Sequence, residues 1–124
     1  MVEKIYFTLR DARNILPKLK PLLRKLILSN VQITVQNDLS IQYEDPDDDM
    51  VQLVKESKRW HRTNLRYFNF IEKLLNVGVV VEDPALGMID FYSKHRGREI
   101  LLCYRYPELT INYWHEIDDV FEQR

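Results

Sequence analysis

Apolar side chains recur at alternating spacings of three and four residues over the first part of the chain. This spacing places them on one side of an α-helix, the side that is buried on folding. Thr8 precedes the run and Asp11 follows three residues later, which is typical of a helix N-terminus because the hydroxyl accepts from a free backbone N–H. The pattern predicts a helix that begins at Leu9. The apolar stripe consists of Leu9, Ala12, Leu16, Leu19, Leu23 and Leu26.

Two prolines, Pro17 and Pro21, lie within this first helical pattern. Each lacks a backbone donor, and its ring clashes with the carbonyl group four residues back. We therefore expect a kink in the helix, or a second helix start near Pro17.

The period of the pattern changes to two between residues 31 and 44. β-Branched residues alternate with polar ones, Asn37 and Asp38 supply turn residues, and the alternation resumes up to Tyr43. This alternation favours a β-hairpin. Continuation of the first helix is the alternative.

A second helix is predicted over residues 50 to 76. Two adjacent rows of mainly apolar side chains, each with members seven residues apart, form a broad face along its whole length. Gly78 is suited to end the helix. The rows are Leu53, Trp60, Tyr67 and Leu74, and Val54, His61, Phe68 and Leu75.

The stretch from Gly78 to Arg105 has the residue pattern of a small β-sheet. Three runs rich in β-branched or large apolar residues are separated by two turn sequences, one with Pro84 and Gly87 and one with Gly97. Three short antiparallel strands in meander order are predicted. The expected runs are Val79 to Val81, Met88 to Ser93, and Glu99 to Tyr106.

The last segment, residues 113 to 123, fits two conformations. If it is helical, His115 and Asp119 lie one turn apart on one face. If it is extended, His115 points away from Trp114 and Glu116. The pattern does not choose between them.

The size of the chain bounds its organisation. A chain of 124 residues fits a single domain, residues 1–124, with a substantial core. We expect an α+β fold in which a long antiparallel helical hairpin packs on a three-stranded antiparallel sheet. One cysteine excludes an internal disulfide, and no signal peptide or apolar run of membrane-spanning length is evident, so we expect a cytoplasmic location and no membrane partner.

Several side chains in the sheet and the last segment carry groups suited to chemistry. Histidine and carboxylates are common ligands of divalent metals, so His115 and Glu116 form a candidate metal site. The alternative is an ordinary closing segment with an ion pair, for example to Arg98 or Arg105. The full candidate pocket consists of Asp90, Arg98, Cys103, His115 and Glu116.

One side of the second helix is basic and is a candidate surface for anions. Its side chains recur at spacings of four, three and four, which suits a phosphate backbone. The slightly acidic balance of the whole chain, with a net charge of −1, counts against this, and the alternative is a solvated face or one docked to acidic segments. The candidate anion-binding residues are Lys55, Arg59, Arg62 and Arg66.

Short motifs at both ends of the chain resemble a small family of prokaryotic proteins, domain-of-unknown-function family 2203. The resemblance implies a helical hairpin against a small sheet, and a continued helix through residues 28 to 48. It transfers no catalytic residues. The motifs include Tyr6-Phe7-Thr8-Leu9, Leu16-Pro17, Gly78-Val79, Asp90-Phe91, Gly97-Arg98, Leu102-Cys103 and Trp114-His115-Glu116.

No residues in the sequence form a complete catalytic constellation, and the three glycines make no phosphate-cradling loop. A non-catalytic binding or interaction module is therefore the first expectation, and whether the chain is an enzyme stays open. The alternatives are a divalent-metal-dependent site at His115 and Glu116, and nucleic-acid binding through the second helix. Because both helical stripes are long, leftover apolar surface suggests a homodimer.

Overall fold

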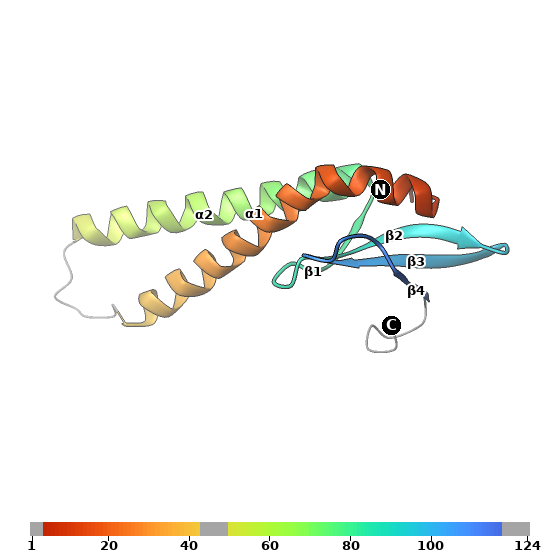
Figure 1. Ribbon diagram of the computed structural model, residues 1–124. Helices are drawn as coiled ribbons and strands as arrows, with labels where there is room; N and C mark the ends of the chain where they lie inside the picture. Colours follow the sequence, from red (N-terminus) through yellow and green to blue (C-terminus); the bar gives the residue numbers. More distant parts are fainter. Residues whose placement is uncertain (1–3, 43–49, 118–124) are drawn as a thin grey trace.

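Two long helices and one four-stranded antiparallel sheet make up the chain in the computed structural model, which describes residues 4–42 and 50–117 (Figure 1). The strands follow one another in the sheet in the order β1-β2-β3-β4. The expected α+β class is confirmed. The elements are α1 (Leu9–Gln42), α2 (Met50–Val77), β1 (Val80–Asp83), β2 (Met88–His95), β3 (Arg98–Arg105) and β4 (Tyr113–Glu116).

The helix N-terminus predicted at Thr8 is confirmed. The backbone N–H of Asp11 donates to Thr8 Oγ1 at 3.0 Å, and the Thr8 N–H donates to Asp11 Oδ2 at 3.4 Å. This reciprocal pair satisfies two donors that a helix start leaves free. α1 then continues through Pro17 and Pro21, so a second helix start near Pro17 is wrong, and its axis changes direction along its length (Figure 1).

The β-hairpin expected over residues 31 to 44 is wrong over the part that the structure describes, because α1 is helical up to Gln42. Contacts with α2 explain the difference. Gln36 Nε2 donates to Thr63 Oγ1 at 3.1 Å, and Trp60 Nε1 donates to Asn37 Oδ1 at 3.0 Å. β-Branched residues are only slightly weaker helix formers than others, so packing between two helices overrides the local alternation. Residues 43 and 44 lie outside the described part.

The sheet has four strands, not the three expected. The fourth, β4, comes from the segment whose conformation the sequence left open, and it pairs with β3 through Cys103 opposite Tyr113 and Leu101 opposite His115. Extended structure at Tyr113–Glu116 therefore depends on hydrogen bonds to a distant strand. Residues 118 to 123 lie outside the described part.

The core lies between α1 and one face of the sheet. Leu16, Leu19 and Leu23 of α1 are each at most 2% exposed. They share one cluster with sheet residues whose side chains all point to the same face, because cross-strand partners in an antiparallel sheet share a face. Figure 1 shows both helices on that side of the sheet. The sheet residues in the cluster are Ile89, Phe91, Ile100, Leu102 and Tyr104.

Neither helix in the described part of the chain combines the length and the apolar character needed to cross a membrane.

The two turns of the meander use glycine for different reasons. Gly87 has φ +66°, and a Cβ built on it would lie 2.7 Å from Ile27 Cδ1 and 3.0 Å from Tyr106 Cβ. Gly97 has φ +77° with open space around it, and Arg96 before it also has positive φ, as a two-residue hairpin turn requires.

Replacing these two glycines by alanine separates backbone strain from steric clash. Gly97→Ala should lower the free energy of unfolding by about 1 kcal/mol, the cost of a side chain at positive φ. Gly87→Ala should cost more, about 2 kcal/mol, because the Ile27 side chain and Tyr106 must also shift. Urea denaturation measures both; equal losses would contradict the close packing at Gly87.

Candidate metal centre

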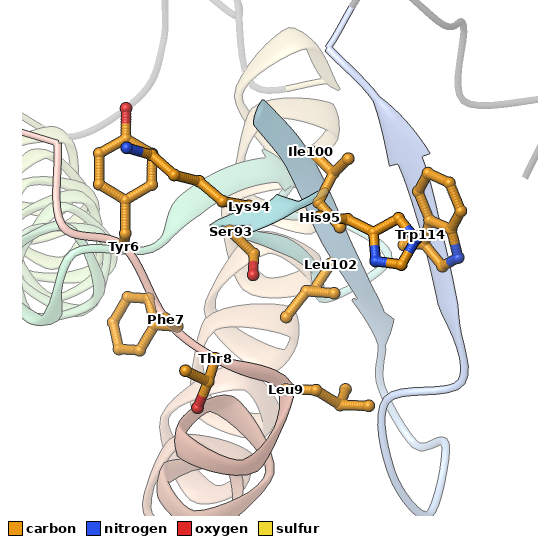
Figure 2. Close-up of a pocket in the computed structure, with 10 residues that line it drawn as sticks. All are labelled: Tyr6, Phe7, Thr8, Leu9, Ser93, Lys94, His95, Ile100, Leu102 and Trp114. Atoms are coloured by element: carbon orange, nitrogen blue, oxygen red, sulfur yellow. The ribbon is translucent and has the colours of Figure 1, made fainter. Parts of the chain in front are cut away.

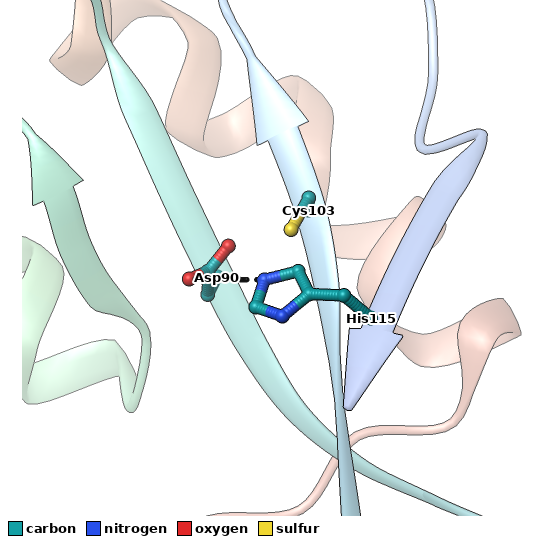
Figure 3. Close-up of side chains that lie close together, drawn as sticks. All are labelled: Asp90, Cys103 and His115. Atoms are coloured by element: carbon teal, nitrogen blue, oxygen red, sulfur yellow. Dashed lines mark ion pairs between the residues drawn. The ribbon is translucent and has the colours of Figure 1, made fainter. Parts of the chain in front are cut away.

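The sheet face that points away from the core carries a cluster of three metal-ligating side chain types. Asp90 on β2 lies opposite Cys103 on β3, and Cys103 lies opposite Tyr113 on β4. Side chains two residues apart on a strand share a face, so His115 joins Asp90 and Cys103. Figure 3 shows the imidazole reaching from β4 toward Asp90, with Cys103 beside them on the strand between.

The three side chains are close and buried. The carboxylate oxygen, thiol sulfur and imidazole nitrogen that they offer all lie within 4.8 Å of one another. His115 Nε2 lies 3.9 Å from Asp90 Oδ2. Asp90 and Cys103 are each 1% exposed and His115 is 8% exposed, so little water reaches the cluster.

The hydrogen bond of His115 determines which of its two ring nitrogens carries the proton. Nδ1 lies 2.8 Å from the backbone oxygen of Glu116, which only accepts, so Nδ1 carries the proton. In the neutral ring Nε2 then carries a lone pair, and this nitrogen faces the carboxylate of Asp90. Metal-binding histidines typically have this arrangement, in which a backbone carbonyl fixes the ring from behind.

Polar atoms at the centre of the cluster are only partly satisfied. Within the described residues, both carboxylate oxygens of Asp90 and Nε2 of His115 are buried without a hydrogen bond of ordinary geometry, although the Cys103 thiol and Glu82 interact with the Asp90 carboxyl. Burial raises the pKa of the Asp90 carboxyl; the nearby Cys103 thiol and His115 oppose this rise, whereas Glu82 adds to it. A carboxylate and a lone pair that face each other in a dry site are stabilised by a cation between them.

The structure divides the five residues of the candidate pocket between the two faces of the sheet. Asp90, Cys103 and His115 come together on one face. Glu116 is on the other face, where its carboxylate pairs with Arg98 at 2.9 Å, because neighbouring residues on a strand point to opposite sides. Glu116 is thus placed as the ion-pair partner of Arg98 and contributes its backbone oxygen, not its carboxylate, to the surroundings of His115.

The sequence placed Asp90 and Cys103 in the candidate pocket, but the expected metal site was limited to His115 and Glu116, although a signal for the pairing of Asp90 with Cys103 was present. A two-residue turn at Arg96 and Gly97 fixes the pairing of the strands on either side, so that Asp90 and Cys103, each six residues from the turn, must face each other. The third ligand depends on β4, whose strand conformation no local signal specified.

The opposite face of the sheet has a separate, mainly apolar cleft of about 470 Å³. It lies between the segment from Tyr6 to Leu9 and the end of the sheet, and His95 and Trp114 form part of its wall (Figure 2). Asp90, Cys103 and His115 do not line it. The cleft and the cluster are therefore distinct features.

Three of the four candidate anion-binding residues line a cleft between the helices. Arg59, Arg62 and Arg66 of α2 line a cleft of about 540 Å³ together with Val31 and Gln36 of α1. Lys55 is not among the residues that line this cleft. No carboxylate in the described part of the chain forms an ion pair with these three arginines.

Residues 5–124 match the family described as "Uncharacterized conserved protein (DUF2203)". The chain belongs to this family. No curated protein and no solved structure matches it. Membership of the DUF2203 family brings no activity with it, so the chemistry of this DUF2203 protein has to be argued from its own residues.

The change in the free energy of unfolding caused by Asp90→Asn should have opposite signs in the metal-free protein and in the protein with bound Zn²⁺. In the metal-free DUF2203 protein at mildly alkaline pH, the change removes a buried carboxylate without a hydrogen bond and should stabilise the fold by about 1 kcal/mol. With excess Zn²⁺ the variant should be the less stable protein, because it lacks one ligand. Thermal unfolding with a chelator and with Zn²⁺ measures both; a destabilised metal-free variant would show that the protein itself already compensates the carboxylate.

Proposed function

We propose that this DUF2203 protein is a binding module that holds a divalent transition-metal ion, with Zn²⁺ as the preferred ion, between Asp90, Cys103 and His115. The single observation that supports this most strongly is the direction of the His115 ring. Its Nδ1 donates to a backbone carbonyl, and its Nε2, which makes no hydrogen bond within the described residues, faces the buried carboxylate of Asp90.

Distances in the cluster favour a metal ion over a shared proton. A separation of 3.9 Å between Nε2 and Oδ2 is too long for a direct hydrogen bond. Two metal–ligand bonds of about 2.0–2.2 Å in a tetrahedral site hold their donor atoms about 3.5 Å apart. The three ligand atoms, all within 4.8 Å of one another, therefore need to close by only about 1 Å around an ion.

The donor set selects among metals. A thiolate is a soft ligand that favours Zn²⁺ over Mg²⁺ or Ca²⁺, and imidazole and carboxylate are both common zinc ligands. Three protein ligands leave a fourth position for water or for another carboxylate, and Glu82 is close enough to Asp90 to raise the pKa of its carboxyl. The burial of all three ligands suits an ion that is retained, which supports binding rather than turnover.

Metal titration tests the proposal. Protein purified without a metal-affinity column should contain or take up about one equivalent of Zn²⁺, and Co²⁺ should give the near-ultraviolet band of a cobalt–thiolate bond together with tetrahedral visible bands. Cys103→Ser should abolish the thiolate band, and His115→Ala should weaken Zn²⁺ binding by more than about 100-fold, since removal of a supporting group alone costs 10- to 100-fold.

Two variants serve as matched controls. Glu116→Gln changes a carboxylate next to His115 that lies on the other face, and His61→Ala removes an exposed histidine of α2. Both should bind Zn²⁺ as the unmodified protein does. Protein that takes up no metal and is not stabilised by Zn²⁺ or Co²⁺ would end the proposal.

A second candidate function is nucleic-acid binding at the cleft between α1 and α2. The observation that favours it is the convergence of Arg59, Arg62 and Arg66 on one cleft beside Gln36, without an ion pair to a described carboxylate. Arginine binds phosphate through a planar fork of donors, so three of them at one cleft suit a phosphate backbone.

Salt dependence tests this second function. Affinity for a single-stranded oligonucleotide should fall as salt rises, and the double variant Arg59→Gln with Arg66→Gln should reduce the slope of log affinity against log salt by about 1.4, since each phosphate contact to a single strand contributes about 0.7. Arg10→Gln, an exposed arginine in the first turn of α1, is the control and should leave the slope almost unchanged. Affinity that does not respond to salt would rule the function out.

A further inference from the structure

Helix α2 carries a second, exposed stripe in which four of the seven positions are apolar and three are charged or polar. Its members recur at spacings of four and three residues, the heptad spacing of helices that pack along their length. Leu65 is 63% exposed and Phe68 is 60% exposed at the middle of this stripe. We define the heptad stripe as Val54, Lys58, His61, Leu65, Phe68, Glu72 and Leu75.

The heptad stripe is distinct from the side of α2 that packs in the core. Thr63 and Leu74 are buried at 7% and 0% exposure, and Tyr67 packs against the core cluster. At 100° per residue, this buried side and the heptad stripe lie on nearly opposite sides of the helix. Large apolar residues that are exposed in a row with heptad spacing indicate a contact with another helix.

We propose that two copies of this chain associate through their heptad stripes, with the two α2 helices antiparallel. The charges on the stripe identify the second copy as the partner. Lys58 and His61 lie on the N-terminal side of Leu65 and Phe68, and Glu72 lies on the C-terminal side. The stripe therefore has a basic end and an acidic end on either side of an apolar centre.

An antiparallel pair makes this surface complementary to itself. When Leu65 packs against Phe68 of the second copy, His61 faces Glu72 of the second copy, and Lys58 lies within one turn of it. A parallel pair would place Lys58 opposite Lys58 and Glu72 opposite Glu72 of the second copy, which is unfavourable in both layers. The charge pattern thus selects both the partner and the direction.

The residues that flank the stripe are compatible with this arrangement. In the antiparallel pair, Arg62 lies opposite Asn69 of the second copy, and Lys55 lies opposite Asn76 of the second copy. No two like charges are brought together at these positions. The metal cluster lies on the sheet and takes no part in the contact, so the inference does not depend on the proposed metal binding.

Sedimentation equilibrium of the full chain over a range of concentrations tests the proposal. The protein should be a dimer, and Leu65→Lys should raise the dissociation constant by more than 100-fold while its circular dichroism stays unchanged. Leu109→Lys is the control, because Leu109 is 89% exposed and lies outside the stripe. A monomer at all concentrations would overturn the proposal, as would a dimer that Leu65→Lys does not weaken.

Charge reversal tests the direction of the helices and does not depend on how the leucine variant folds. Glu72→Lys alone should weaken the dimer about 10-fold, because it faces basic residues of the second copy. Lys58→Glu combined with Glu72→Lys should recover most of this loss, since both ends are exchanged and opposite charges meet again. A double variant as weak as the single one would contradict the antiparallel pairing.

Discussion

The fold depends on the burial of the leucine stripe of α1 against one face of the sheet. Leu16, Leu19 and Leu23 are almost completely buried there, against strand residues that alternate with the period of two. This contact fixes the register of the strands, because a slip by one residue would turn every core side chain away from α1. It also fixes the opposite face, since residues between the core positions must point the other way. Asp90 and Cys103 are such residues.

The candidate metal centre is thus a consequence of the core packing as well as of its own residue types. Its three ligands come from three neighbouring strands, and strands hold side chains more rigidly than loops do. The cluster is buried although its face lies away from the helices, and His115 Nε2 and the Asp90 carboxylate oxygens have no well-formed hydrogen bond among the described residues. Buried polar groups of this kind destabilise a fold unless something satisfies them. A bound cation would satisfy a carboxylate and an imidazole lone pair at once.

Helix α2 shows how one element can serve two contacts. Its buried side completes the core and packs on α1, and its heptad stripe leaves Leu65 and Phe68 in solvent. The arginines lie on a third side and line the cleft with α1. The geometry of the helix separates these three sides, so an anion and a second copy would occupy different sides of α2. The metal cluster lies apart from both, on the sheet.

Local sequence determined the helix starts, the turns and the first three strands, because caps, glycines at positive φ and apolar periodicity act over a few residues. The turn at Arg96 and Gly97 even implied that Asp90 faces Cys103. Tertiary structure decided the rest. Residues up to Gln42 are helical because α2 provides hydrogen bonds and packing that outweigh a weak local preference. His115 joins Asp90 because the tail pairs with β3, and such pairing between distant segments leaves no local signature in the chain.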